Sequence, residues 1–160
     1  MKTLIVYASR QGCTKDCAVL LGEKLPGETE LTDIRKGGIP KLEDYGAVII
    51  GASVNAGSVN RGIKKFCQEN LKSLLEKKTG IFICCAAPKT KGAEYINENF
   101  PADLVSHGMI NSVFGGEYRY EKMGFLECKL IKMIEKKSGT SAPGIDHAEI
   151  DRFAAAFNRD

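Results

Sequence analysis

The chain has 160 residues, of which 43% are hydrophobic and 27% charged, and its formal net charge is +3. This length suits one domain with a full core, and we expect residues 1–160 to form a single domain. The composition is that of an ordered globular protein, and the small net charge argues against nucleic-acid binding.

The start of the chain and its cysteines indicate a location. The apolar run that follows Lys2 ends at Ser9, so it is shorter than the h-region of a signal peptide. No segment reaches the roughly 18–20 consecutive apolar residues of a membrane span. The six cysteines match no disulfide framework, which predicts reduced thiols. We therefore expect a cytoplasmic protein.

Short apolar runs bounded by glycine or polar clusters alternate with longer segments of helical period. This alternation is typical of a parallel sheet with crossover helices. We predict an α/β fold with three layers, built on a doubly wound, five-stranded parallel sheet. The predicted strands cover residues 2–7, 28–33, 47–52, 80–86 and 109–115.

Between the strands, apolar residues recur with the period of an amphipathic helix. One of these segments contains Pro101, so one short helix or two fit it equally well. The last helix begins after Asp146, a good N-cap, and Glu149 completes the capping-box arrangement. A loop is predicted before it at residues 138–144. The other predicted helical segments cover residues 14–25, 60–77, 93–107 and 121–137.

The helix predicted at residues 121–137 is amphipathic and basic, with most of its lysines on one side. Such an apolar face usually packs on its own protein, which leaves the lysines in solvent. The alternative is peripheral contact with an anionic membrane surface. The sequence leaves both interpretations open, with burial the more common outcome. The apolar face carries Met123, Leu126, Leu130, Met133 and Ile134.

A loop of small and polar residues, SRQGCT, joins the first predicted strand to the first predicted helix. At such a junction backbone N–H groups and the helix dipole converge on an anion. Ser9 and Thr14 add hydroxyl groups, and Gly12 lets the backbone approach a ligand closely. The loop matches neither the Walker A motif nor the dinucleotide fingerprint. We predict a phosphate cradle; the alternative is that Gly12 only makes a turn and Thr14 only caps the helix.

The opening segment LIVYASRQGCTKDCAVLLGEKL resembles that of flavodoxins, whose first strand ends in a hydroxyl-rich loop, commonly T/S-x-T-G-x-T. The chain is most similar to the branch that contains menaquinone-dependent protoporphyrinogen oxidase. That branch has a phosphate loop similar to STRDGQT, a third strand that ends in V-I-G-A-S, like residues 48–53, and a G-x-x-R-Y segment, like residues 116–120. The resemblance covers nearly the whole chain. It implies the strand order 2-1-3-4-5 and the cofactor FMN, with the FMN phosphate held at Ser9, Arg10, Gln11, Gly12, Cys13 and Thr14.

Two further loops, at residues 52–62 after the third predicted strand and 86–92 after the fourth, should meet the same site, because ligands of doubly wound sheets bind beyond the carboxyl ends of the strands. The resemblance implies that these loops border the flavin ring, although plain surface turns are the alternative. Neither loop has an aromatic residue and the chain has no tryptophan, which predicts a weakly held or exposed flavin. The residues expected at the ring are Ser53, Val54, Asn55, Ala56, Gly57, Ala86, Ala87, Pro88 and Tyr118.

The resemblance implies electron transfer by FMN, with no side chain predicted to act as a catalytic acid or base. Electron-carrying flavodoxins are usually strongly acidic, whereas this chain carries a net charge of +3. One alternative is therefore a flavin-dependent oxidoreductase that resembles the quinone-linked protoporphyrinogen oxidases, and another is a phosphate-binding domain without flavin. The expected partner is a redox protein, a quinone or another small-molecule substrate.

The cysteines suggest a different chemistry. Cys13 lies at the N-terminus of a predicted helix, whose dipole lowers the pKa of a thiol, and Cys17 lies one helical turn further on. Two cysteines at this spacing supply only two ligands, so we predict neither a metal site nor a redox pair. Cys84 and Cys85 alternate along a strand and should face opposite sides of the sheet as core residues.

Overall fold

The structure, a computed structural model, describes residues 1–139 and 142–159. Its centre is a five-stranded sheet in the order β2-β1-β3-β4-β5, and all four pairings are parallel. This arrangement confirms the predicted doubly wound fold, and the strand order reverses beside β1. The strands are β1 (Thr3–Ala8), β2 (Thr29–Asp33), β3 (Ala47–Ser53), β4 (Lys78–Cys84) and β5 (Ile110–Val113).

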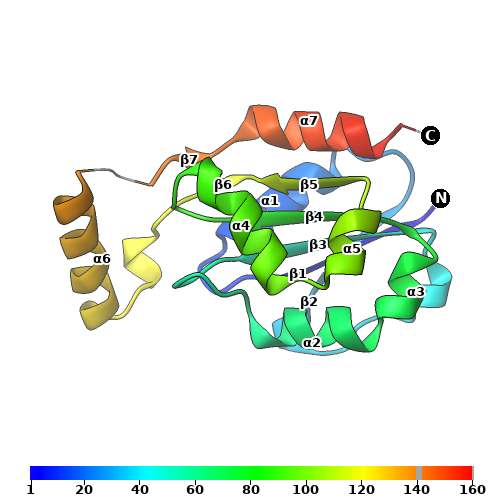
Figure 1. The fold of residues 1–160 in the computed structure, drawn as a ribbon, viewed down its shortest axis with the longest axis horizontal. Coiled ribbons are helices and arrows are strands. Elements are labelled where there is room, and N and C mark those ends of the chain that lie inside the picture. The colour runs from blue at the N-terminus through cyan, green and yellow to red at the C-terminus, as the bar shows by residue number, and fades with distance from the viewer. Residues whose placement is uncertain (140–141, 160) are drawn as a thin grey trace.

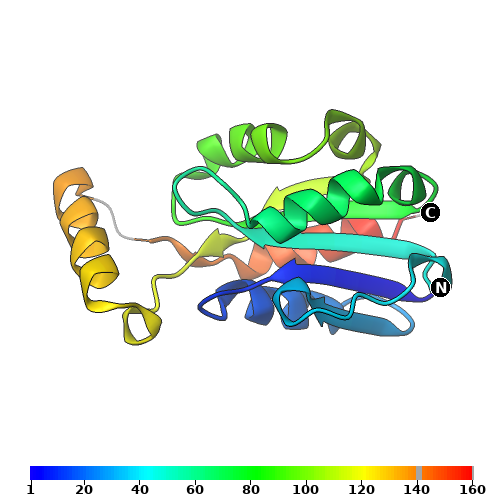
Figure 2. The same ribbon diagram turned by 90° about the horizontal axis from the view of Figure 1, so that it is seen from below.

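Helices cover both faces of the sheet, which gives three layers (Figure 1, Figure 2). α1 (Cys13–Gly22) and α7 (His147–Phe157) pack on one face, over a core that includes Ile5 and Phe82. All six residues of β1 are buried, as expected for a strand covered on both sides. The opposite face carries α2 (Arg61–Glu69), α3 (Leu71–Leu75), α4 (Lys89–Asn99) and α5 (Ala102–His107).

The helix predicted at residues 60–77 is in fact two helices, α2 and α3, which meet at Asn70. The side chain of Asn70 donates to the carbonyl oxygen of Phe66 at 2.9 Å, and such local side-chain bonds compete with the helical ladder. The apolar stripe continues past the break, so periodicity alone conceals it. The segment at residues 93–107 also contains two helices, α4 and α5, separated at Pro101.

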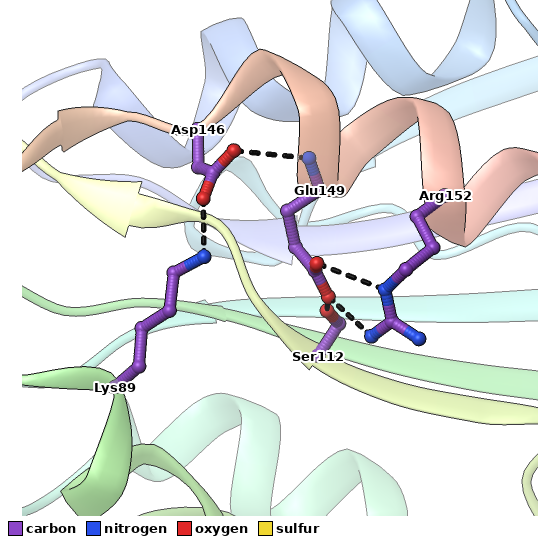
Figure 3. Close-up of polar contacts among 5 residues, drawn as sticks. All are labelled: Lys89, Ser112, Asp146, Glu149 and Arg152. Atoms are coloured by element: carbon purple, nitrogen blue, oxygen red, sulfur yellow. Dashed lines mark hydrogen bonds and ion pairs between the residues drawn. The ribbon is translucent and has the colours of Figure 1, made fainter.

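Asp146 caps α7 as predicted, since its Oδ1 accepts the N–H of Glu149 at 3.0 Å. The return bond of a capping box is absent, because the Asp146 N–H donates to a backbone carbonyl instead. The carboxylate of Glu149 accepts hydrogen bonds from Ser112 and Arg152, and Asp146 also pairs with Lys89 (Figure 3). These contacts tie α7 to β5 and to the start of α4.

After β5 the chain leaves the sheet and returns only at α7. β6 (Gly115–Gly116) pairs antiparallel with β7 (Gly144–Ile145) at the base of this excursion. A 3-10 turn (Tyr120–Lys122) and α6 (Phe125–Ser138) lie between them, and α6 stands beyond the carboxyl ends of the strands, apart from the three layers (Figure 1, Figure 2). The loop predicted at residues 138–144 includes residues 140–141, which lie outside the described residues.

Candidate functional site

The N-terminus of α1 is open to an anion. Gly12 precedes the helix with φ +98° and ψ −11°, a left-handed conformation that favours glycine. Ser9 Oγ accepts the N–H of Gly12 at 3.1 Å, and no described side chain caps the helix itself. Thr14 is buried, and its Oγ1 has no hydrogen-bond partner within residues 1–139 and 142–159. Free helix N–H groups beside a buried hydroxyl suit a phosphate.

Two cations stand over this loop. A Cβ atom built on Gly12 would lie 2.9 Å from Arg119 Nη1 and 3.3 Å from Lys122 Nζ. Arg119 is held there by Asp16, which lies in the first turn of α1 and pairs with the guanidinium at 2.6 Å. The space above the glycine is therefore lined by positive charge, which favours an anionic group such as a phosphate.

The loop after β3 closes into a tight turn. Asn55 and Ser58 exchange backbone hydrogen bonds of 2.9 and 3.1 Å. The residues between them, Ala56 and Gly57, have φ values of +50° and +77°, as in a type I′ turn. This turn fixes the backbone of the loop, so Asn55 and the end of β3 are held in place before any ligand binds.

A pocket lies where the ends of β1, β3 and β4 meet α6. Of the residues predicted for the site, Gly12 lies under Arg119, Ala56 and Gly57 form the turn, and Ala87 and Pro88 lead into α4, so these five are not in the lining. The structure brings the other predicted residues together in the lining: Ser9, Arg10, Gln11, Cys13, Thr14, Ser53, Val54, Asn55, Ala86 and Tyr118.

Other lining residues were not predicted. The sequence treats residues 121–137 as a helix separate from the site, although the G-x-x-R-Y segment just before it was a signal that this region approaches the loop. No local sequence pattern indicates that the remaining residues share one pocket, because the fold brings them together from distant parts of the chain. These additional residues are Cys84, Cys85, Gly116, Glu117, Met123, Glu127 and Ile131.

The pocket is small because α6 and the residues before it cover it. Its volume is about 80 Å³, whereas small-molecule sites usually measure roughly 300–1,000 Å³. The cover is attached to the phosphate loop by an ion pair between Arg10 and Glu127 (3.0 Å) and by the Arg119 N–H, which donates to Gln11 Oε1 (3.4 Å). This volume is smaller than a flat aromatic ligand of flavin size needs.

Three thiols meet beneath the phosphate loop. The Sγ atoms of Cys13, Cys17 and Cys84 lie within 4.8 Å of one another, and all three residues are buried. Cys85 belongs to the core on the other side of the sheet, which confirms that Cys84 and Cys85 face opposite sides. Hydrogen bonds from the thiols of Cys17 and Cys84, with the N–H of Glu117, hold the pKa of Cys13 well below its usual range. The same hydrogen bonds raise the pKa of the two donating thiols, Cys17 and Cys84.

The apolar face of α6 is exposed, so the expectation that it packs on its own protein is wrong. α6 stands beyond the end of the sheet (Figure 2). Its residues Glu127 and Ile131 line the pocket. None of the helices in the described part of the chain combines the length and apolar character needed to cross a bilayer. Phe125 is 82% and Leu126 79% exposed, and the exposed face also includes Leu130, Met133 and Ile134.

These features define a class of protein. The sheet is doubly wound in the order 2-1-3-4-5, and an open helix N-terminus lies at the switch point, where proteins of this class bind phosphorylated ligands. The sequence model of the family described as "Flavodoxin domain" matches residues 4–143. The chain belongs to this family, as the resemblance of its first loop predicted.

Individual relatives agree with this family. The chain is 23% identical over 147 residues to a protein of Escherichia coli (strain K12) named "Protoporphyrinogen IX dehydrogenase [quinone]". The matched region covers 87% of this chain and 81% of that relative. Oxidised flavodoxin 1 from Bacillus cereus has a similar fold, with a TM-score of 0.57, 20% identity and coverage of 98% and 97% of the two chains. A flavoprotein from Lactobacillus acidophilus in complex with FMN has a TM-score of 0.51 and 16% identity, covering 70% and 92%.

Proposed function

We propose that this protein binds FMN without a covalent bond and carries electrons between redox partners. The observation that carries the proposal is the open N-terminus of α1, where Gly12 is left-handed and the buried Thr14 hydroxyl has no partner within residues 1–139 and 142–159. A phosphate there would accept hydrogen bonds from the first N–H groups of the helix and from this hydroxyl. The FMN complex of the similarly folded Lactobacillus acidophilus flavoprotein supports the choice of ligand.

The residues of the chain would position the flavin, which supplies the redox chemistry when it is bound. Residues 9–14 would hold the phosphate, with Arg119 and Lys122 adding positive charge above it. Residues 53–57, residues 86–88 and Tyr118 would border the ring. We also propose that residues 1–160 form one flavodoxin-like domain and that the protein is cytoplasmic, a location that suits its six free thiols.

Binding of the ring requires residues 117–131 to open, because they fill the space over the pocket. The described polar contacts of this cover with the phosphate loop and α1 include the Arg10–Glu127 ion pair and the bonds of Arg119 to Asp16 and Gln11, and Met123 and Ile131 add apolar contact at the pocket. Arg10 is 63% exposed, and an exposed ion pair contributes only about 0–1 kcal/mol. Arg119 is 17% exposed, so its pair with Asp16 is better shielded from solvent.

The visible spectrum of the purified protein, before and after incubation with FMN, tests this function. We expect flavin absorption in a one-to-one ratio with protein, reversible bleaching under an anaerobic reductant and reoxidation by an electron acceptor. A colourless protein that takes up no FMN would contradict the proposal and leave a phosphate-binding domain without flavin.

A second candidate function is that of a flavin-dependent enzyme that delivers electrons to a quinone at a membrane. The exposed face of α6 favours it, because apolar side chains there lie beside lysines, with four lysines and two glutamates in residues 125–138. Such a helix fits an anionic lipid surface, and its other side covers the flavin pocket. The name of the Escherichia coli relative supplies the substrate class, a porphyrinogen, and the acceptor, a quinone.

Two experiments separate this enzyme from a simple carrier. In an anaerobic assay with protoporphyrinogen and a menaquinone, porphyrin fluorescence that rises faster than in a control with FMN alone would support the enzyme, and an equal rate would reject it. In sedimentation with anionic and neutral vesicles, we expect binding to anionic vesicles only. Met133→Gln on α6 should weaken it severalfold, whereas Met109→Gln, which removes a similarly exposed methionine away from α6, should not.

A further inference from the structure

We propose that Cys13, Cys17 and Cys84 form a binding site for a thiophilic divalent cation such as Zn²⁺. Their sulfur atoms lie within 4.8 Å of one another. In a tetrahedral zinc site, Zn–S bonds of about 2.3 Å place the sulfurs about 3.8 Å apart. The cluster therefore needs sulfur displacements of only about 1 Å or less to surround one cation.

The fold assembles this cluster from two distant segments. Cys13 and Cys17 lie one helical turn apart on the same face of α1. Cys84 is the last residue of β4 and belongs to the core under α1. Because the three residues lie on packed helix and strand rather than on loops, their positions are fixed before a cation binds, as a preorganised site requires.

The surroundings of the cluster allow a cation to enter and to complete its coordination. Cys13 and Cys84 also line the pocket, whose volume of about 80 Å³ has room for a water molecule as the fourth ligand. Three thiolates and a divalent cation carry a net charge of −1. The N-terminus of α1 and the Arg119 guanidinium, which stands over Gly12, lie next to this charge and offset it.

The chemistry of the donors selects the kind of cation. Sulfur ligands favour Zn²⁺ and similar soft ions, whereas Ca²⁺ and Mg²⁺ require oxygen ligands. A disulfide, the other product that neighbouring thiols can form, would bring two sulfurs to about 2.05 Å and leave the third without a role. A cation uses all three.

Co²⁺, a spectroscopic substitute for Zn²⁺, tests the site in the full-length, reduced, metal-free and flavin-free protein. We expect one equivalent to produce thiolate-to-cobalt charge-transfer bands and the visible bands of tetrahedral Co²⁺, and Zn²⁺ to displace it. Removing an outer-shell partner of a metal typically costs 10–100-fold in affinity, so Cys13→Ala, Cys17→Ala or Cys84→Ala should each cost more than about 100-fold. Cys67→Ala, which removes a buried thiol from the core on the other side of the sheet, should bind as the wild type does.

The proposal is overturned if wild-type protein shows no charge-transfer bands, or if the alanine variants of these four cysteines bind Co²⁺ equally. Alkylation of wild-type protein in mild urea, followed by mass spectrometry, covers the case in which a variant does not fold. Zn²⁺ should then protect Cys13, Cys17 and Cys84 but not the partly exposed Cys128. Equal labelling with and without Zn²⁺ would also overturn the site. Neither measurement involves flavin, so failure here leaves the FMN proposal untouched.

Discussion

Replacing Gly12 with alanine tests the phosphate cradle apart from general stability. The glycine has φ +98°, and a left-handed conformation costs a residue with a Cβ atom about 1–2 kcal/mol. The atoms nearest to the new Cβ would be Arg119 Nη1 at 2.9 Å and Lys122 Nζ at 3.3 Å, the ends of flexible side chains that can move away. We therefore expect the midpoint of thermal unfolding to fall by about 2–8 °C, with the fold retained.

Gly12→Ala should also weaken FMN binding, in addition to lowering the stability of the fold. The added methyl group would stand between the loop and the two cations, in the space that a phosphate would occupy. Losing one hydrogen bond to a charged group costs about 1.5–3 kcal/mol, which corresponds to a roughly 10–100-fold weaker Kd for FMN. The assay is quenching of flavin fluorescence on titration with protein.

Gly139→Ala is the matched control for Gly12→Ala. Gly139, the C-cap of α6, is also left-handed (φ +66°, ψ +10°) and has nothing within 4 Å of an added Cβ, so this variant carries similar backbone strain outside the phosphate loop. It should lose similar stability and keep its FMN affinity. If Gly12→Ala binds FMN as tightly as Gly139→Ala does, the phosphate does not lie over Gly12 and the argument is refuted.

Two further predictions concern stability. In Gly51→Ala the new Cβ would lie 2.2 Å from Cζ of the fully buried Phe82, so we expect the free energy of unfolding in urea to fall by about 1–3 kcal/mol. Gly124→Ala, with open space around the new Cβ, should show no such loss, and equal stability of the two variants would contradict this packing. Hydrogen bonds from Arg152, and then Ser112, lower the pKa of Glu149 below its ordinary value of 4.5. Its contribution to stability is therefore complete above that pH and lost as the pH falls through the folded-state pKa, so Glu149→Gln should flatten the acid side of the pH–stability curve. An unchanged acid slope would show that Glu149 does not contribute.

Much of the fold could be predicted because its physical causes are local. Strands buried on both faces must be continuously apolar, and crossover helices must carry one apolar stripe, so the alternation of the two patterns predicts a doubly wound sheet. The break at Asn70 was missed because Leu71 and Leu74 continue the stripe of α2 across it. Periodicity reports which face is apolar and not whether the helix is continuous.

The site was only partly predictable, because its remaining parts depend on long-range packing. The loop after β1 could be identified from the sequence, because a glycine and hydroxyl residues at a strand–helix junction are a local pattern that suits phosphate binding. The exposure of α6 could not be predicted, because an amphipathic pattern does not say what covers the apolar face. The contact of Cys84 with Cys13 and Cys17 could not be predicted either, because it depends on which face of β4 lies under α1.

The central claim is that the open N-terminus of α1 binds the phosphate of a flavin nucleotide. Parallel fluorescence titrations with FMN and riboflavin test it most directly, because the two ligands share the ring and differ by the phosphate. We expect FMN to bind in a one-to-one ratio and riboflavin at least about tenfold more weakly, as the loss of a charged hydrogen-bonded group requires. Equal affinity for the two ligands, or no quenching by either, would contradict the account.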